Sequence, residues 1–108
     1  MRAKRLSEYR IMWVFVFFDL PTGTPKERKA ATSFRQELLK DGFTMFQYSI
    51  YMRHCASMEQ AQTHVRRVKA MLPDEGEVVI MTLTDKQFGM MEHFSSRKPT
   101  DAVQLPGL

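Results

Sequence analysis

The residue best suited to chemistry in this 108-residue sequence is Asp19, an aspartate at the end of a long apolar run. The run covers residues 11–18 and contains no polar side chain, which predicts a central strand buried on both faces. A carboxylate at the end of such a strand is costly to desolvate unless a cation, an arginine or backbone N–H groups bind it. Two interpretations follow: Asp19 holds a metal ion, or it caps the next loop as an Asx turn over Thr22 or Gly23.

The metal interpretation carries a prediction about assembly. Hydrolysis of a phosphodiester with Mg²⁺ or Mn²⁺ uses one or two carboxylates, and water fills the remaining ligand positions. No other acidic residue lies near Asp19 in the sequence, since Asp41 belongs to the far end of the following helix. A two-fold dimer supplies two carboxylates, because the axis places a residue beside its own mate. The metal interpretation therefore predicts a homodimer in which Asp19 faces Asp19.

The histidines and the single cysteine show no comparable pattern. His54 and Cys55 are adjacent and point to opposite faces of a predicted strand. His64 is expected on the polar side of a helix, and His93 lies near the C-terminal tail. Their spacing matches no metal-ligand set, and the sequence has no glycine-rich phosphate loop. We expect structural roles for all four.

Positive charge is concentrated in the first two thirds of the chain. The sequence has 16 Lys and Arg against 12 Asp and Glu, a net charge of +4. Residues 1–72 hold 13 of the basic and 6 of the acidic side chains, whereas residues 73–108 hold 3 and 6. This distribution favours a polyanionic partner, because Lys and Arg that neutralise phosphates release counterions. The predicted nucleic-acid contacts form two helical groups: Lys26, Arg28 and Lys29 in the first, Arg66 and Arg67 in the second.

Helix signals separate the predicted strands. Thr24 and Glu27 match a capping box around Pro25, and Asp41-Gly42 is a typical helix end. Ser57 begins a second helix whose apolar residues recur at spacings of three and four until Pro73. That apolar stripe is expected to face the core and has five members: Met58, Ala61, Val65, Val68 and Leu72.

The remaining segments predict further strands. Residues 43–54 alternate in polarity and form one strand or two, and residues 76–84 predict another buried strand before a short helical turn over 85–91. The polar face of residues 43–54, a second candidate binding surface, is expected to hold Gln47, Ser49, Tyr51 and Arg53.

The chain length allows one domain. The order of elements predicts an α/β (α+β) sandwich of the ferredoxin-like type, βαββαβ, with both helices on one face of an antiparallel sheet. The domain is expected to span residues 1–92, and residues 93–108 to form an extended tail. Val103 and Leu105 share one face of that tail and are expected to anchor it on the dimer mate or on a partner protein. The alternative is a frayed terminus.

Two features bear on location. A single cysteine, Cys55, favours the reducing cytoplasm over a disulfide-stabilised secreted fold. The apolar run over residues 11–18 follows a basic segment, but it is too short for a membrane helix and is followed by no signal-peptide cleavage pattern. We expect a cytoplasmic protein with no membrane partner.

Several segments, in order along the chain, resemble one known family. They are Phe17-Phe18-Asp19-Leu20-Pro21-Thr22, Glu27-Arg28-Lys29, Phe34-Arg35 with Leu38-Leu39, the pattern Gly-Phe-x-Met-x-Gln-x-Ser-Ile-Tyr over residues 42–51, and Thr-Leu-Thr-Asp-Lys-Gln-Phe over residues 82–88. Together they make most of the chain similar to the CRISPR-associated Cas2 family, especially to members that accompany large single-protein effector nucleases.

The resemblance implies a ferredoxin-like homodimer that is the small subunit of the complex for capturing foreign DNA as new spacers. In that complex the family's dimer bridges dimers of the CRISPR integrase subunit and binds duplex DNA. Some members of the family are also metal-dependent endonucleases on RNA or duplex DNA. Their metal ligand corresponds to Asp19, so the resemblance implies that Asp19 is the catalytic residue and the ligand of Mg²⁺ or Mn²⁺.

Three functions stay open from the sequence. The first is a DNA-binding adaptor of spacer acquisition in a prokaryotic cytoplasm. The second is a stand-alone Mg²⁺-dependent endoribonuclease or DNase centred on Asp19. The third is a regulatory ferredoxin-like domain without a nucleic-acid partner.

Overall fold

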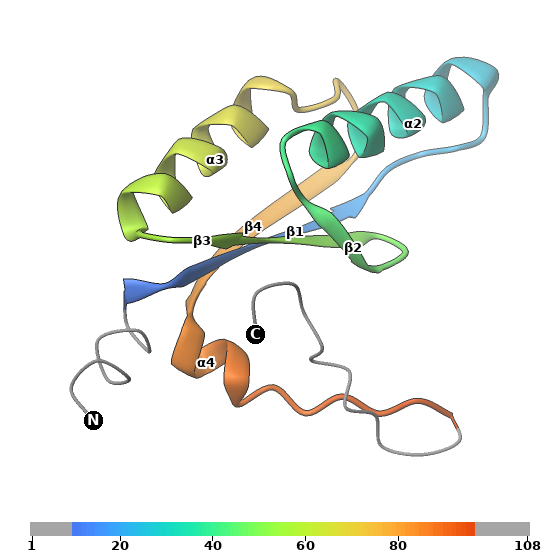
Figure 1. Cartoon of the computed structure of the whole chain (residues 1–108). Helices are drawn as coiled ribbons and strands as arrows, with labels where there is room; N and C mark the ends of the chain where they lie inside the picture. The colour runs from blue at the N-terminus through green and yellow to red at the C-terminus, as the bar shows by residue number, and fades with distance from the viewer. Residues whose placement is uncertain (1–9, 97–108) are drawn as a thin grey trace, which may run out of the picture.

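A computed structural model describes residues 10–96, so the predictions for Val103 and Leu105 lie outside the described residues. In chain order the elements are β1 (Met12–Asp19), α2 (Pro25–Lys40), β2 (Thr44–Gln47), β3 (Ile50–Cys55), α3 (Met58–Ala70), β4 (Glu77–Thr84) and α4 (Asp85–Gly89). The strands pair antiparallel in the order β2-β3-β1-β4, so β1 lies in the interior of the sheet. Figure 1 shows the strands with α2 and α3 on one side of them. The ferredoxin-like α+β fold is confirmed.

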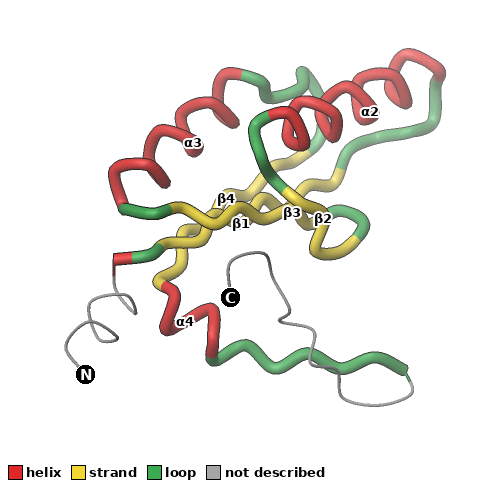
Figure 2. Tube along the Cα trace, viewed as in Figure 1, coloured by secondary structure: helices red, strands yellow, loops and turns green. Residues whose placement is uncertain are grey.

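The sheet is covered on both faces by different elements. Helices α2 and α3 lie over one face, and α4 lies on the other side, as the tube in Figure 2 shows. The helix-covered core takes alternate residues of β1 together with the apolar stripes of both helices: Met12, Val14, Val16, Phe18, Phe34, Leu38, Ala61 and Val68. The second core is formed by Trp13, Phe15, Met52 and Phe88. Both faces of β1 are therefore buried, as the apolar run predicts.

The predicted helix starts are present. The Thr24 hydroxyl accepts a hydrogen bond from the Glu27 N–H, and the Glu27 carboxylate accepts one from the Thr24 N–H. Ser57 caps α3 in the same way through the Gln60 N–H. Gly42, after the C-cap of α2, has a φ of 90°, a backbone conformation that glycine adopts readily.

Residues 43–54 form a hairpin whose turn is Tyr48-Ser49, and the expectation that Tyr51 belongs to a polar binding surface is wrong. Tyr51 is only 4% exposed and belongs to the helix-covered core. The reason is topological: β3 lies between β2 and β1, and the helices cover the face that Tyr51 occupies.

The last strand, β4, is an edge strand and is less buried than its sequence predicts. Val79 is 60% exposed and Met81 41% exposed, because α4 covers only part of that face. Met58 and Leu72 are also exposed, since Met58 is the first residue of α3 and Leu72 lies beyond its end.

Within residues 10–96, no helix has the length and apolar character that crossing a bilayer requires.

Candidate functional site

Asp19 is the last residue of β1 and is exposed. Strand side chains alternate between faces, and Phe18 packs in the helix-covered core. Asp19 therefore lies on the opposite face, which it shares with Phe15 and Phe17. Phe17 is only partly covered there, and Val79, its partner on β4, is largely exposed. Asp19 thus borders an apolar part of the sheet that α4 leaves open.

A second carboxylate lies opposite Asp19 within the same chain. The pairing of β1 with β4 places Glu77 directly across from Asp19, and both residues are exposed. Side chains at such positions have Cβ atoms about 4.5–5.5 Å apart. The expectation that one chain supplies a single carboxylate is wrong, because antiparallel pairing joins the end of β1 to the start of β4.

The backbone around Asp19 is tightly packed at Gly76. Gly76 has a φ of 95°, and a Cβ atom there would lie 2.7 Å from the Asp19 carbonyl oxygen and 2.8 Å from Leu20 Cδ2. Only glycine fits this approach without a shift of the neighbouring chain. Gly76 therefore fixes the start of β4, and with it Glu77, against Asp19.

The oxygen donors at this corner fit the predicted cation. Mg²⁺ and Mn²⁺ prefer carboxylate oxygens, and Mg²⁺ commonly takes one or two carboxylates and keeps several waters. Asp19 and Glu77 provide such donors, whereas the described residues hold no group of three or more His, Cys, Asp or Glu placed to bind a metal. One chain thus offers a partial set of ligands. Within residues 10–96, no hydrogen bond joins the Asp19 carboxylate to Thr22 or Gly23, so the structure does not contain the Asx turn of the loop-cap interpretation.

The predicted basic residues lie on α2 and α3, the helices of the opposite face. Lys26, Arg28 and Lys29 are exposed, and Arg28 Nη1 donates to the Thr22 carbonyl oxygen at 3.1 Å. Lys26 also lines a pocket of about 210 Å³ together with Asp74 and Glu75. These two carboxylates reduce the positive potential at the start of α2, and the structure brings no predicted basic residue onto the face of Asp19.

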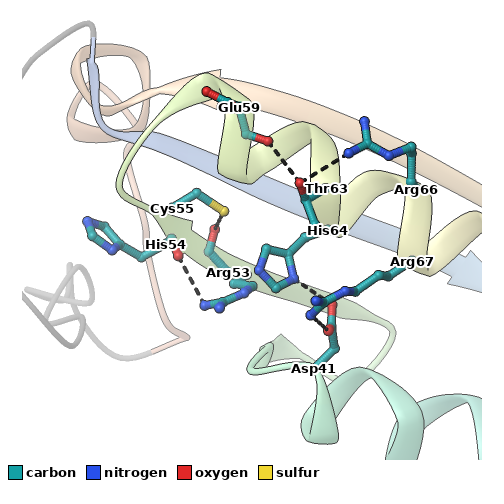
Figure 3. A network of polar contacts seen from close by, with 9 residues as sticks. All are labelled: Asp41, Arg53, His54, Cys55, Glu59, Thr63, His64, Arg66 and Arg67. Carbon is teal, nitrogen blue, oxygen red and sulfur yellow. Dashed lines mark hydrogen bonds and ion pairs between the residues drawn. The ribbon is translucent and has the colours of Figure 1, made fainter.

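The two arginines on α3 differ in their environments (Figure 3). Arg66 is exposed, and among the described residues it donates only to the Thr63 hydroxyl, at 3.2 Å. Arg67 Nη1 donates to Asp41 Oδ1 at 2.9 Å, so its charge is partly neutralised within the chain. Arg66 is therefore the better phosphate contact of the pair.

The expectation that His64 is a surface residue is wrong. Its side chain is buried, and its Nδ1 lies 2.7 Å from Asp41 Oδ2 (Figure 3). Burial raises the pKa of Asp41, but the hydrogen bonds from His64 and Arg67 outweigh burial and leave that pKa below its ordinary value. These contacts join α3 to the C-cap of α2, so His64 and Asp41 stabilise the helix layer.

The other residues considered for chemistry have structural surroundings. Cys55 is buried, and burial raises the pKa of its thiol, which makes it a poor nucleophile. The His54 ring packs edge-on against Trp13 with centroids 5.0 Å apart, and the His93 ring lies 5.9 Å from Phe46.

Comparison with known proteins identifies the family. The family model described as "CRISPR associated protein Cas2" matches residues 12–91, most of the chain. The chain belongs to the Cas2 family. A Flavobacterium psychrophilum protein named "CRISPR-associated endoribonuclease Cas2" is 57% identical over 97 residues, which cover 90% of this chain and 84% of that protein. A Parvibaculum lavamentivorans protein of the same name is 54% identical over 95 residues, 88% of this chain and 94% of that one.

The fold agrees with a solved Cas2 structure. A chain described as "Crystal structure of cas2" superposes with a TM-score of 0.55 at 22% identity, covering 82% of this chain and 90% of that chain. At this identity the likeness shows the fold alone. The resemblance of the sequence segments to the Cas2 family is thereby confirmed, and the fold is the one that the family resemblance implies.

Proposed function

We propose that this Cas2 family member is a homodimeric, metal-dependent endoribonuclease. The observation that carries the proposal is the position of Asp19 and Glu77 beside the open apolar part of the sheet. If two copies pack this face around a two-fold axis near β1, the Asp19 carboxylates of both copies approach each other. Val79 and Met81, which are poorly covered in one chain, would then be buried.

The chemistry of the paired site follows from its donors. A divalent cation, when bound, supplies Lewis acidity to the phosphodiester. The carboxylate oxygens of Asp19 and Glu77 would hold it, and a bound cation would reduce the repulsion between these two charges. Phe17 and Val79 provide an apolar border beside the two carboxylates, which the packing of two copies on this face would bury. The names of both relatives reported above, each an endoribonuclease, support RNA as the substrate.

A second function is favoured by a separate observation: the basic side chains lie on the helix layer, away from the face of Asp19. Lys26, Arg28, Lys29 and Arg66 offer phosphate contacts that do not require the nucleic acid to reach Asp19. Such a surface suits an adaptor that binds duplex DNA and bridges integrase subunits during spacer acquisition. The tail residues Val103 and Leu105 are proposed to contribute to the contact with the integrase or the dimer mate.

Purified wild-type protein and Asp19→Asn separate the two functions. The nuclease proposal predicts Mg²⁺- or Mn²⁺-dependent cleavage of RNA by the wild type and none by Asp19→Asn, with folding preserved because Asp19 is exposed. Equal cleavage by both proteins would contradict it. The adaptor proposal predicts that Asp19→Asn still supports spacer acquisition in cells.

Charge reversal tests the adaptor surface. Arg66→Glu should weaken duplex DNA binding and lower the salt dependence by about one counterion per lost contact, with unchanged thermal stability. Arg67→Glu is the informative comparison, because it also breaks the contact with Asp41 and should lower stability. Unchanged affinity and salt dependence in Arg66→Glu would remove Arg66 from the binding surface.

A further inference from the structure

An arginine from α2 is stacked on an exposed tyrosine of the β2–β3 turn. The guanidinium carbon of Arg35 lies 4.5 Å from the centroid of the Tyr48 ring and 5.4 Å from that of Phe18. Tyr48 is 72% exposed, the most exposed of the large apolar and aromatic residues in the described chain. A planar cation over one side of the ring fixes its orientation and leaves the rest of the ring in solvent.

Apart from its contacts with the Tyr48 and Phe18 rings, the Arg35 guanidinium has no carboxylate partner within residues 10–96. No hydrogen bond or ion pair joins Arg35 to residues 10–96, and its Nε atom is buried without a partner. Arg67 differs in this respect, since Asp41 partly neutralises its charge. A half-buried guanidinium without a counter-ion favours an anionic ligand over an apolar one.

The stacked pair lies close to the end of β1. The Phe18 N–H donates to the carbonyl oxygen of Ser49, the residue after Tyr48, at 3.0 Å. Arg28 is seven residues before Arg35, so both arginines lie on the same side of α2, about 10 Å apart along its axis. Tyr48 and Arg35 are therefore in contact, and Arg28 adds a second cation on the same side of α2, about two helical turns before Arg35.

We propose that Tyr48, held by Arg35, stacks on an unpaired nucleobase of a single-stranded nucleic acid whose phosphates contact Arg35 and Arg28. The proposal deepens the proposed nucleic-acid function and rests on it. A free ring face binds any exposed base, whereas in a duplex the base faces are already stacked on one another. Tyr48 thus selects unpaired strands. The lysines and arginines of the helix layer, in contrast, contact only phosphates, which single strands and duplexes both carry.

The test measures binding without cleavage, in the Asp19→Asn background and in EDTA. The probe is a short single-stranded RNA that carries one 2-aminopurine, whose fluorescence is quenched when the base stacks on an aromatic ring. We expect quenching with Tyr48 and with Tyr48→Phe, which keeps the ring. We expect loss of quenching and an affinity about 5- to 150-fold weaker in Tyr48→Ala. Arg35→Lys keeps the charge and should weaken quenching, because it removes the planar group that orients the ring.

The comparison ligands are a single-stranded DNA and a duplex of the same sequence. If Tyr48→Ala loses the same affinity for single-stranded RNA and DNA, Tyr48 contacts the base. If the loss of affinity is larger on RNA, part of the contact is with the sugar. Both results support the proposal. Equal affinity of Tyr48→Ala and wild type for single strands overturns it, as does an equal loss on the duplex. A Tyr48→Ala protein that sediments as a monomer while wild type is a dimer would assign Tyr48 to the subunit contact instead. Wild-type protein that binds no nucleic acid would defeat the nucleic-acid function as well, whereas a wild type that binds single strands independently of Tyr48 defeats this inference alone.

Discussion

Asp19 and Glu77 are direct partners in the antiparallel pairing of β1 and β4, so two carboxylates share one face where β1 ends and β4 begins. Like charges at opposed positions destabilise an antiparallel pair. Neither the capping of α2 nor the packing of the sheet requires an acidic residue at position 77. The placement of Asp19 opposite Glu77 is understandable as part of a cation site. The energetic cost of the repulsion between the two carboxylates can be measured.

Glu77→Gln should stabilise the metal-free protein by about 0.2–1 kcal/mol, because it removes the repulsion of Asp19 while keeping the shape of the side chain. Urea denaturation in EDTA measures this difference. Added Mg²⁺ should reduce this difference in stability, since the cation stabilises the wild type, which has both carboxylates, more than it stabilises Glu77→Gln. Glu75→Gln, an exposed acidic residue outside the pairing, is the control and should show neither effect. Identical behaviour of the two variants would show that Asp19 and Glu77 do not interact.

Gly76→Ala should lower the free energy of unfolding by about 1–2 kcal/mol or more. The cost has two sources: a left-handed backbone conformation, and a Cβ atom 2.7 Å from the Asp19 carbonyl oxygen. Gly89→Ala is a matched control, since its added Cβ meets no atom within 4 Å and should be neutral or stabilise by up to about 1 kcal/mol. Thermal unfolding of both variants provides the comparison. A Gly76→Ala protein as stable as Gly89→Ala would mean that the close approach to Asp19 is absent in solution.

Val79→Glu should convert a dimer to a monomer with little change in the fold. Val79 is 60% exposed in one chain, so the glutamate costs the isolated subunit no more than about 0.5 kcal/mol, but it is buried and unpaired if two copies meet on this face. Sedimentation at micromolar concentration measures the assembly. Gln36→Glu places the same charge on the helix layer and should leave the dimer intact. A Val79→Glu protein that remains dimeric would place the subunit contact elsewhere.

Asp41→Asn should destabilise the protein at neutral pH by about 1.5–3 kcal/mol, the range for hydrogen bonds to a charged group. The pKa of Asp41 in the folded protein lies below its ordinary value of 3.8, so the ionised carboxylate stabilises the fold above that pH. This contribution is lost as the pH falls through the folded-state pKa. Wild-type stability should therefore begin to approach that of Asp41→Asn as the pH falls below 3.8, and should reach it only below the lowered pKa of the folded protein, as followed by urea denaturation across pH.

The control for that measurement is Glu37→Gln, which removes an exposed carboxylate 3.8 Å from Lys40. An exposed pair of this kind contributes about 0–1 kcal/mol, so its loss should be small at every pH. A constant difference between wild type and Asp41→Asn from neutral to acid pH would show that the contacts with His64 and Arg67 do not depend on the charge of Asp41.

Local features of the fold were predictable because they depend on neighbours in sequence. The Thr24–Glu27 capping box, the left-handed conformation of Gly42 and the burial of β1 on both faces follow from residue types at short spacing. The position of Asp19 at the end of β1 was predictable for the same reason.

Features that depend on pairing were not predictable from local pattern. Tyr51 alternates with apolar residues, so its position in the sequence is typical of the solvent-exposed face of a strand. The order of the strands instead places Tyr51 beneath the helices. The sequence pattern places His64 on the polar side of α3. In the structure His64 is buried, and its hydrogen-bond partner is Asp41 at the C-cap of α2. The position of Glu77 beside Asp19 could have been predicted in one way. If residues 11–18 pair antiparallel with residues 76–84, the end of the first strand meets the start of the last.

The central claim is that Asp19 residues of two copies share one cation, and the stoichiometry of Mn²⁺ binding tests it most directly. Electron paramagnetic resonance distinguishes free from bound Mn²⁺ as purified protein is titrated, without any need for catalytic turnover. We expect one Mn²⁺ for every two wild-type chains, weaker binding in Glu77→Gln, and no specific binding in Asp19→Asn, which should remain dimeric. One Mn²⁺ for each chain, or unchanged binding in Asp19→Asn, would contradict a shared site at Asp19.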